Sequence, residues 1–545
     1  MPIRIALVIG VVCGAAFGQL QPMSPPAQNP QTPEKVLLGK FLFWEEQLSS
    51  DDTVACGTCH LPEFGGSDGR EALAPGLDGT YGTPDDIHGS LGVVRQTSSG
   101  EFTPSNVFGF RPQVTMRTSP SNLGAGHHAA LFWDLRAGST FVDPETGQVL
   151  IPFNGSLESQ AVGPILSSAE MGRVGRTWQD VRAKLQSVEP MKLASNLPAD
   201  MVAGRMVYPS YPDLFTAAFG DPYISAARIA FALGSYQRTL NPDQTPWDLF
   251  RAGNPAAMTA YERQGWALFK NQGNCISCHW EPLFSDDLPH NLGLRPSFED
   301  VGAFNTSGLA FDVGGFKTPT LRNAGLRTRL FHNGQSPSLD DPDQLTDAAS
   351  TLNVYLQGGG VDLSNLDPFM LPLAAQGVTS ADMQVMQDFI ITALTDPRAA
   401  NRLPPFDHPD LRSAVVAPPR VFGPSLTGAS EPFVIDSAPA YPGNSDYRLG
   451  IAGGDGAGLA VLTYGFQSFE PNLSFGLLPW HVDVFSWIPV ALQGNAGSPG
   501  YATLLLPIPD VPTLSLYPLY WQLLVADPQA PAGIASSRGW EFIIQ

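Results

Sequence analysis

The stretch Cys56-Gly57-Thr58-Cys59-His60 has a counterpart further along the chain, Cys275-Ile276-Ser277-Cys278-His279. The chain has five cysteines, and four of them belong to these two C-x-x-C-H motifs. Two thiols three residues apart on a helical turn can reach the two vinyl groups of one porphyrin, and the adjacent imidazole can then bind the iron. The sequence therefore predicts two covalently attached haem c groups, with His60 and His279 as proximal iron ligands.

A disulfide or half of a four-cysteine zinc site is the alternative explanation for a C-x-x-C pair. Neither requires a histidine directly after the second cysteine, and both motifs have one. We therefore favour haem over zinc or disulfides.

Composition limits the function classes. The chain has 545 residues, of which 43% are hydrophobic and 15% charged, with 55 glycines and 51 prolines. This favours a loop-rich globular protein of about three domains. The net charge of -21 argues against partners such as nucleic acid or an anionic membrane surface. A redox partner should approach with a basic or neutral face.

The N-terminus has the features of a signal peptide over residues 1–18. Arg4 precedes an apolar stretch, residues 5–12, that is too short to span a bilayer, and Ala16-Phe17-Gly18 offers a cleavage site. Val12 is a poor residue before a lipidated Cys13, which favours soluble export. We expect a secreted, periplasmic or extracellular protein without a membrane span.

Composition and periodicity divide the rest of the chain. Residues 19–33 form a flexible leader, 34–250 the first haem region, 251–412 the second and 413–428 a linker. Helices are expected at 226–240, 258–269 and 380–394. Residues 429–545 are expected to form a β-sandwich-like accessory domain, because short β-prone runs at 459–464, 482–490, 502–507 and 520–525 alternate with turns.

Residues 65–100 form an insertion whose segment 78–86 is rich in Asp and Gly and could hold Ca²⁺. Its spacing is not that of an EF-hand, and we favour a polar surface loop.

Further motifs give the chain a resemblance to a known family over roughly residues 35–400. They are Phe132-Trp133-Asp134-Leu135-Arg136, the segment 160–171 (Q-A-V-G-P-I-L-S-S-A-E-M), the segment 284–293, the segment 317–323 (K-T-P-T-L-R-N) and the segment 331–334 (F-H-N-G). In this set and order the chain resembles the bacterial di-haem cytochrome c peroxidases, which include the MauG-type enzymes. Leu135 stands where the family has glycine. The resemblance implies a mainly α protein of two cytochrome c-like haem domains, followed here by the all-β domain.

The resemblance also implies roles for individual residues. The haem on His60 would be the peroxide site, and the haem on His279 the electron-transfer site. Trp133 would relay electrons between them. Gln160 and Glu170 would lie on the open side of the first haem, where a carboxylate can move a proton and an amide can orient peroxide.

The chain departs from the family at the first haem. Members with a distal histidine carry it at a position that corresponds to Phe110, which cannot bind iron. His88 is a weak substitute, and His127 and His128 are expected to pack near the haem domain. We therefore expect an open first haem, as in MauG-like members.

The other axial ligand of the second haem is Met in the classical peroxidases and Tyr in MauG-like ones. Tyr355 is our candidate, and Met370 is the alternative. The family's inter-haem Ca²⁺ site is in doubt, because Thr118, Arg327 and Arg329 stand at the corresponding positions and added positive charge opposes a cation.

The favoured function is reduction of hydrogen peroxide with electrons from a small redox protein or another external donor. A MauG-type oxidase that modifies a protein or organic substrate is one alternative. A non-enzymatic di-haem electron carrier is the other, although a carrier needs no acid–base group beside iron.

Overall fold

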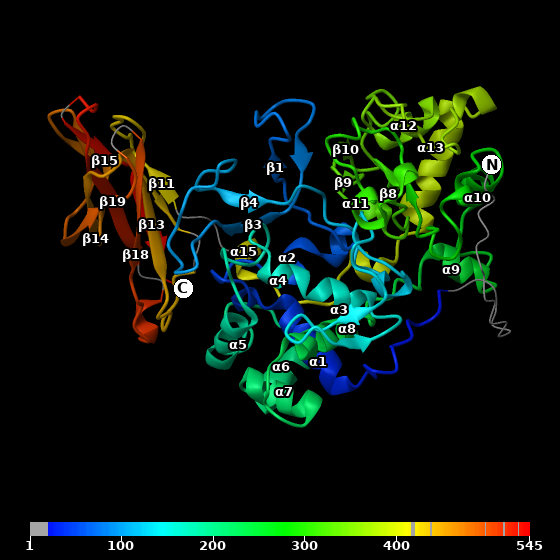
Figure 1. The fold of residues 1–545 in the computed structure, drawn as a ribbon, viewed down its shortest axis with the longest axis horizontal. Helices are drawn as coiled ribbons and strands as arrows, with labels where there is room; N and C mark the ends of the chain where they lie inside the picture. Colours follow the sequence, from blue (N-terminus) through cyan, green and yellow to red (C-terminus); the bar gives the residue numbers. More distant parts are fainter. Residues whose placement is uncertain are drawn as a thin grey trace.

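The computed structural model describes residues 20–415, 420–436, 439–495, 498–515, 518–531 and 533–544. The expected signal peptide lies outside these ranges. Figure 1 shows three bodies: the second haem region with α10, α12 and α13, the first haem region with α1 and α8, and a β domain beside the first region. No helix within the described ranges is both long and apolar enough to cross a membrane.

The first region is built on two crossing helices, α1 (Pro33–Trp44) and α8 (Ala226–Gln237). Thr32 caps α1 by accepting a hydrogen bond from the Lys35 backbone, and Pro33 provides the fixed φ of a first helical turn. The helices cross at Gly39, where a Cβ would lie 2.0 Å from the Ala232 carbonyl oxygen. The remaining helices of this region are α2 (Cys56–Cys59), α3 (Ser156–Ala161), α4 (Gly163–Leu166), α5 (Trp178–Ser187), α6 (Ala199–Val207) and α7 (Tyr211–Phe219).

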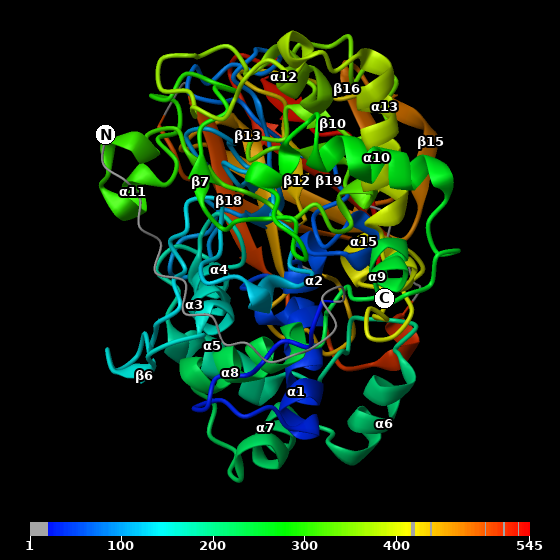
Figure 2. The same cartoon turned by 90° about the vertical axis from the view of Figure 1, so that its right-hand side faces the viewer.

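The second region packs α10 (Ala260–Lys270) against α13 (Ser380–Asp388) and the π-helical turn Phe389–Ala393 that continues it. Each α-helix starts with a capping box, which explains why the sequence marks both beginnings so clearly. The other helices are α9 (Pro246–Arg251), α11 (Phe304–Ser307), α12 (Thr351–Gln357), α14 (Pro397–Ala400) and, after this region, α15 (Arg412–Val415). Figure 2 shows α10, α12 and α13 together, opposite α1 and α7.

The expectation of a mainly α protein is not confirmed, because helices make up 27% of the structure and strands 19%. Loops and two-stranded pairs connect the short helices. These strands are β1 (Leu73–Ala74), β2 (Ile87–His88), β3 (Leu91–Val94), β4 (Pro112–Val114), β5 (Phe141–Val142), β6 (Val149–Ile151), β7 (Pro289–His290), β8 (Phe316–Lys317), β9 (Arg329–Leu330) and β10 (Ser336–Pro337).

The C-terminal region is β-rich, as expected. One antiparallel sheet has the order β11-β21-β19-β14-β17, with β20 beside β19, and a second has the order β12-β13-β18. Both sheets contribute to one apolar core, which includes Ile451, Leu462 and Leu523. The strands are β11 (Arg420–Phe422), β12 (Phe433–Ile435), β13 (Arg448–Asp455), β14 (Leu459–Gly465), β15 (Ser468–Phe475), β16 (Leu478–Val482), β17 (Ser486–Ala491), β18 (Pro499–Leu505), β19 (Pro518–Ala526), β20 (Ile534–Ser536) and β21 (Gly539–Ile543).

Three sequence boundaries need correction. The leader is not free: Leu20 and Met23 are buried, and Asn29 donates a hydrogen bond to Glu158 at 2.8 Å. The linker contains β11, which pairs with β21. The run 482–490 is divided between β16 and β17.

The segment directly after the insertion contacts the β domain. Phe102 is buried, and its backbone N–H donates to the Thr503 hydroxyl at 2.7 Å. The Phe110 ring meets the rings of Phe433 and Tyr501. The position where a distal ligand would be sought therefore serves an interface between domains.

Candidate active site

The first C-x-x-C-H motif forms α2, and its side chains line a cavity of about 650 Å³. The Thr58 hydroxyl accepts a hydrogen bond from the Ala55 backbone at 2.8 Å, which fixes the start of the turn. The His60 Nδ1 donates to the Gly66 carbonyl oxygen at 2.9 Å. This bond orients the ring and leaves Nε2 as the nitrogen that can bind a metal.

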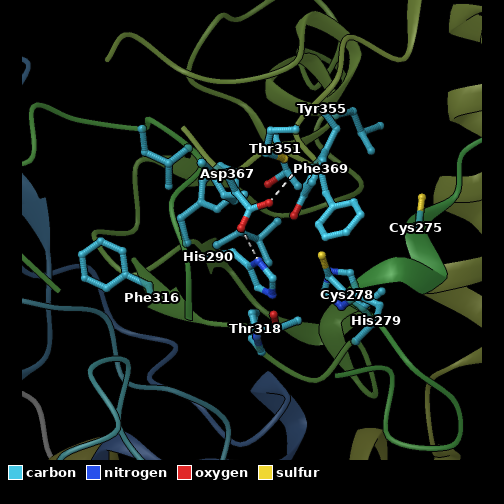
Figure 3. A pocket seen from close by; sticks show the side chains of 18 of the residues that line it. Cys275, Cys278, His279, His290, Phe316, Thr318, Thr351, Tyr355, Asp367 and Phe369 are labelled. Atoms are coloured by element: carbon cyan, nitrogen blue, oxygen red, sulfur yellow. Dashed lines mark hydrogen bonds and ion pairs between the residues drawn. The ribbon is translucent and has the colours of Figure 1, made fainter. Parts of the chain in front are cut away.

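The second motif forms the 3-10 turn Cys275–Ser277 and borders a second cavity. The His279 Nδ1 donates to the Phe284 carbonyl oxygen, also at 2.9 Å. Figure 3 shows Cys275, Cys278 and His279 at one side of this cavity, with Tyr355 and Phe369 above them. Both histidines are thus oriented by a backbone carbonyl five or six residues further on.

None of the four cysteines of the two motifs forms a disulfide, so both pairs are available for attachment to a porphyrin. Burial raises the pKa of the Cys56, Cys59 and Cys275 thiols to about 12, so these three are protonated. Among the described residues, the one group with the spacing of metal ligands is Cys278, Asp286 and His290, so the cysteine pairs form no four-cysteine zinc site. Two reduced thiols beside an oriented imidazole at the edge of each cavity fit a haem c group.

The first cavity also gathers the residues expected to handle peroxide. Gln160, at the end of α3, and Glu170, in the loop after α4, both line it. Burial raises the pKa of the Glu170 carboxyl, and this effect outweighs the opposing hydrogen bond from Ser167 and the nearby Arg136 guanidinium. The cavity therefore contains a carboxyl whose proton affinity is increased.

Trp133 lies between the two cavities and lines both. It is 5% exposed, and its indole N–H donates to the Thr118 carbonyl oxygen at 2.7 Å. The Trp133 carbonyl oxygen accepts from the Lys317 backbone at 2.8 Å, so both haem regions hold it.

The two candidates for the second axial ligand, Tyr355 of α12 and Met370, both line the second cavity. Burial raises the pKa of the Tyr355 phenol above its ordinary value, so the phenol is neutral in the absence of a metal. Asp367 lies beside them and accepts from His290 at 2.7 Å. The structure therefore brings both candidate residues to the same cavity.

The histidines outside the two motifs have other partners. His88 and His127 do not line the first cavity; the His127 Nε2 lies 2.9 Å from the Asn241 amide oxygen. His128 does line the cavity, but its Nδ1 is hydrogen-bonded to Asp287.

At both candidate calcium positions, the polar groups form hydrogen bonds within the protein. Asp78, Asp85 and Asp86 accept hydrogen bonds from backbone N–H groups of their own loop, which is how polar surface turns are stabilised. At the inter-haem position, Thr118 donates to the His88 carbonyl oxygen, and Arg327 donates to the Ser119 carbonyl oxygen.

The structure reveals a repeat that our sequence analysis missed. The backbone of 124–135 is repeated at 323–334: a left-handed residue opens each segment (Gly124, Asn323), and a 3-10 turn follows. Trp133 corresponds to His332, which is buried, lines the second cavity and lies 6.4 Å from the Trp133 ring. The sequence contains a sign of this repeat: both segments have Ala-Gly followed, five residues after the glycine, by Leu-Phe.

Three comparisons with known proteins bear on this site. The model of the family described as di-haem cytochrome c peroxidase matches residues 33–256. The methylamine utilization protein MauG of Methylophilus methylotrophus is 31% identical over 311 residues, which cover 57% of this chain and 71% of that protein. The cytochrome-c peroxidase IdrP1 of Denitromonas iodatirespirans is 28% identical over 441 residues, covering 72% of this chain and 94% of that protein.

Among solved structures, a MauG-like protein associated with microbial copper homeostasis aligns with a TM-score of 0.48 at 22% identity, over 71% of this chain and 96% of that one.

Two cavities that each border a C-x-x-C-H motif, with Trp133 lining both, fit a di-haem protein, and the chain belongs to the di-haem cytochrome c peroxidase family, which includes MauG. Membership implies haem c cofactors and an oxidoreductase activity.

Proposed function

We propose that this protein reduces hydrogen peroxide to water at the first cavity, with electrons that an external donor delivers through the second. The observation that carries the proposal is that Glu170 and Gln160 line the same cavity as Cys56, Cys59 and His60. An electron carrier has no use for an acid–base group there.

The reaction takes up two electrons and two protons per peroxide and releases two waters. When bound, the haems supply the redox chemistry, and covalent attachment through both cysteine pairs would keep them in place. Glu170 takes a proton from one peroxide oxygen and gives it to the oxygen that departs as water. Its raised proton affinity suits this exchange, because efficient proton shuttles have a pKa near the working pH.

The neutral Gln160 amide orients peroxide without competing for its proton. Arg136 lies near Glu170 and stabilises its ionised form. Its guanidinium is held by Asp134 at 2.9 Å and stacks on the Phe132 ring at 3.6 Å. These contacts keep the charge in place during turnover.

Trp133 carries electrons from the second site to the first. Support comes from its burial and its position at both cavities. His60 and His279 are the proximal ligands in this proposal. The first haem stays open in this proposal, because Phe110, at the position of the family's distal histidine, packs against the rings of Phe433 and Tyr501 instead. The electron donor is a small redox protein met after export.

A second candidate is a MauG-type oxidase, which would withdraw electrons from a protein or organic substrate. The observation that favours it is Tyr355, because a phenolate ligand stabilises oxidised iron whereas a Met370 thioether would raise the potential.

The variant Glu170→Gln tests the assigned proton transfer. We expect kcat for peroxide to fall by about 10²–10⁴-fold, the usual contribution of a general acid–base group. Haem content and the resting optical spectrum should stay unchanged. Glu101→Gln, an exposed position directly after the insertion, is the matched control and should retain full activity. Undiminished turnover in Glu170→Gln would refute the role.

A further inference from the structure

Arg327 is a buried cation without a carboxylate partner. Only 4% of the surface of Arg327 is exposed. Within the described part of the chain, no ion pair reaches it; its guanidinium donates to the Ser119 carbonyl oxygen at 3.1 Å, and its Nε has no partner. Burial lowers the pKa of the guanidinium to about 10, so the group is still charged at neutral pH.

The three other buried arginines of the described residues show how such a charge is stabilised. Arg176 donates to three backbone carbonyl oxygens, those of Ile165, Met171 and Leu48, at 2.9, 3.1 and 2.7 Å, whereas Arg327 donates to one. Arg322 donates to both oxygens of Asp248 at 2.7 and 2.8 Å, and Arg238 donates to both oxygens of Glu158 at 2.7 and 2.9 Å. A buried charge without compensation is strongly destabilising, which is why both pairs are bidentate. Arg327 lacks this compensation from the protein.

The position of Arg327 is between the two sites. Its guanidinium lies 6.0 Å from the ring centroid of Trp133, the residue that lines both cavities. Arg327 is one of the residues that line the second cavity. The missing counter-charge should therefore come from whatever fills that cavity.

The internal repeat explains why the partner is absent. Arg327 corresponds to His128, the residue at the end of the equivalent 3-10 turn in the first region. His128 crosses to the second region and pairs with Asp287, three residues after Phe284, whose carbonyl orients His279. Three residues after Gly66, whose carbonyl orients His60, stands Gly69. The carboxylate of one half is a glycine in the other.

We propose that Arg327 binds a propionate carboxylate of the porphyrin in the second cavity and is the fixed cation between the two haems. This inference rests on the proposed two-haem site. A guanidinium suits a carboxylate because it can donate two parallel hydrogen bonds. Because this cation is part of the chain, the inter-haem position needs no exchangeable divalent ion.

The test is a redox titration of the full holoprotein followed by optical spectroscopy. Removing a positive charge beside a haem stabilises its ferric form. Arg327→Gln should therefore lower the midpoint potential of the second haem by the equivalent of about a tenfold change in the reduction equilibrium, 59 mV for one electron. Arg327→Lys keeps the charge and should restore most of the potential.

Arg329→Gln is the matched control, because Arg329 lies two residues away and pairs with the exposed Glu71 at 3.1 Å. It should leave both potentials unchanged. Equal potentials in Arg327→Gln and the wild type, with two haems attached in each, would overturn the inference.

A second measurement needs no variant. Dialysis of the wild-type holoprotein against a calcium chelator should change neither midpoint potential, and a chelator-dependent shift would overturn the inference. Both results are independent of the Glu170→Gln kinetics. The absence of attached porphyrin, by contrast, would refute the proposed function itself.

Discussion

The two haem regions share one scaffold and differ in what surrounds it. In both, the histidine of the motif donates to a backbone carbonyl at 2.9 Å. The regions also exchange equivalent hydrogen bonds: the Thr118 backbone donates to the His332 carbonyl oxygen at 2.7 Å, and the Lys317 backbone donates to the Trp133 carbonyl oxygen at 2.8 Å. This reciprocal pairing shows that the halves are arranged about an approximate two-fold axis.

The two haem regions differ in the residues that line their cavities. The wall of the first cavity contains the proton-transfer candidates Glu170 and Gln160, whereas that of the second contains Tyr355, Met370 and the doubly hydrogen-bonded His290. The first cavity, at about 650 Å³, is also larger than the second, at about 240 Å³. One scaffold therefore supports two chemistries, because the residues that line each cavity decide access and protonation.

Removing the attachment cysteines should produce the largest effect. We expect Cys56→Ala with Cys59→Ala to abolish peroxide turnover and to leave one attached haem. Cys275→Ala with Cys278→Ala should leave the other haem, abolish donor-driven turnover and retain a single stoichiometric reaction with peroxide. Mass spectrometry and peroxide assays check this, and identical activity profiles for the two double variants would contradict the division of labour.

Replacing Trp133 should have an intermediate effect. Trp133→Phe should slow electron transfer between the haems by roughly tenfold, equivalent to about 1.4 kcal/mol in the activation barrier, because a phenyl ring is harder to oxidise than an indole. Stopped-flow spectroscopy of the reduced protein mixed with peroxide measures the step. The variant of its counterpart, His332→Phe, should change it less, because a neutral histidine is hard to oxidise. A larger effect of His332→Phe would assign the relay to the other half.

The pH dependence of turnover should reflect only the first region. Glu170 accepts a proton as a carboxylate, and burial raises its pKa above the ordinary value of 4.5. Turnover should therefore fall as the pH decreases through this raised pKa, by about tenfold per pH unit below it. Glu170→Gln should lose this acid limb, and its persistence in the variant would point to another group.

The smallest effect concerns the two equivalent turns, which end at Leu135 and Gly334. Both residues have a positive φ, 62° and 68° respectively. Leu135→Gly should raise the free energy of unfolding by about 1 kcal/mol, because a left-handed conformation is costly for a residue with a Cβ. Gly334→Ala should lower it, since the new Cβ would lie 2.7 Å from the Thr118 hydroxyl oxygen. Chemical denaturation measures both free energies of unfolding. A lower value for Leu135→Gly, or a higher value for Gly334→Ala, would contradict the equivalence of the two turns.

Local chemistry explains what the sequence determined by itself. A C-x-x-C-H motif carries its thiols and imidazole within one turn, so both haem positions follow from spacing alone. Capping boxes at Thr259 and Thr379 mark the helices α10 and α13 in the same way. The alternation of β-prone runs and turns predicted the C-terminal β region.

Only the tertiary structure decided the contacts between distant segments. It placed Trp133 at both cavities, docked Phe110 on the β domain and left Arg327 buried without a carboxylate. The physical reason is that burial and charge compensation depend on which segments meet, and residues two hundred positions apart carry no local signal of that encounter.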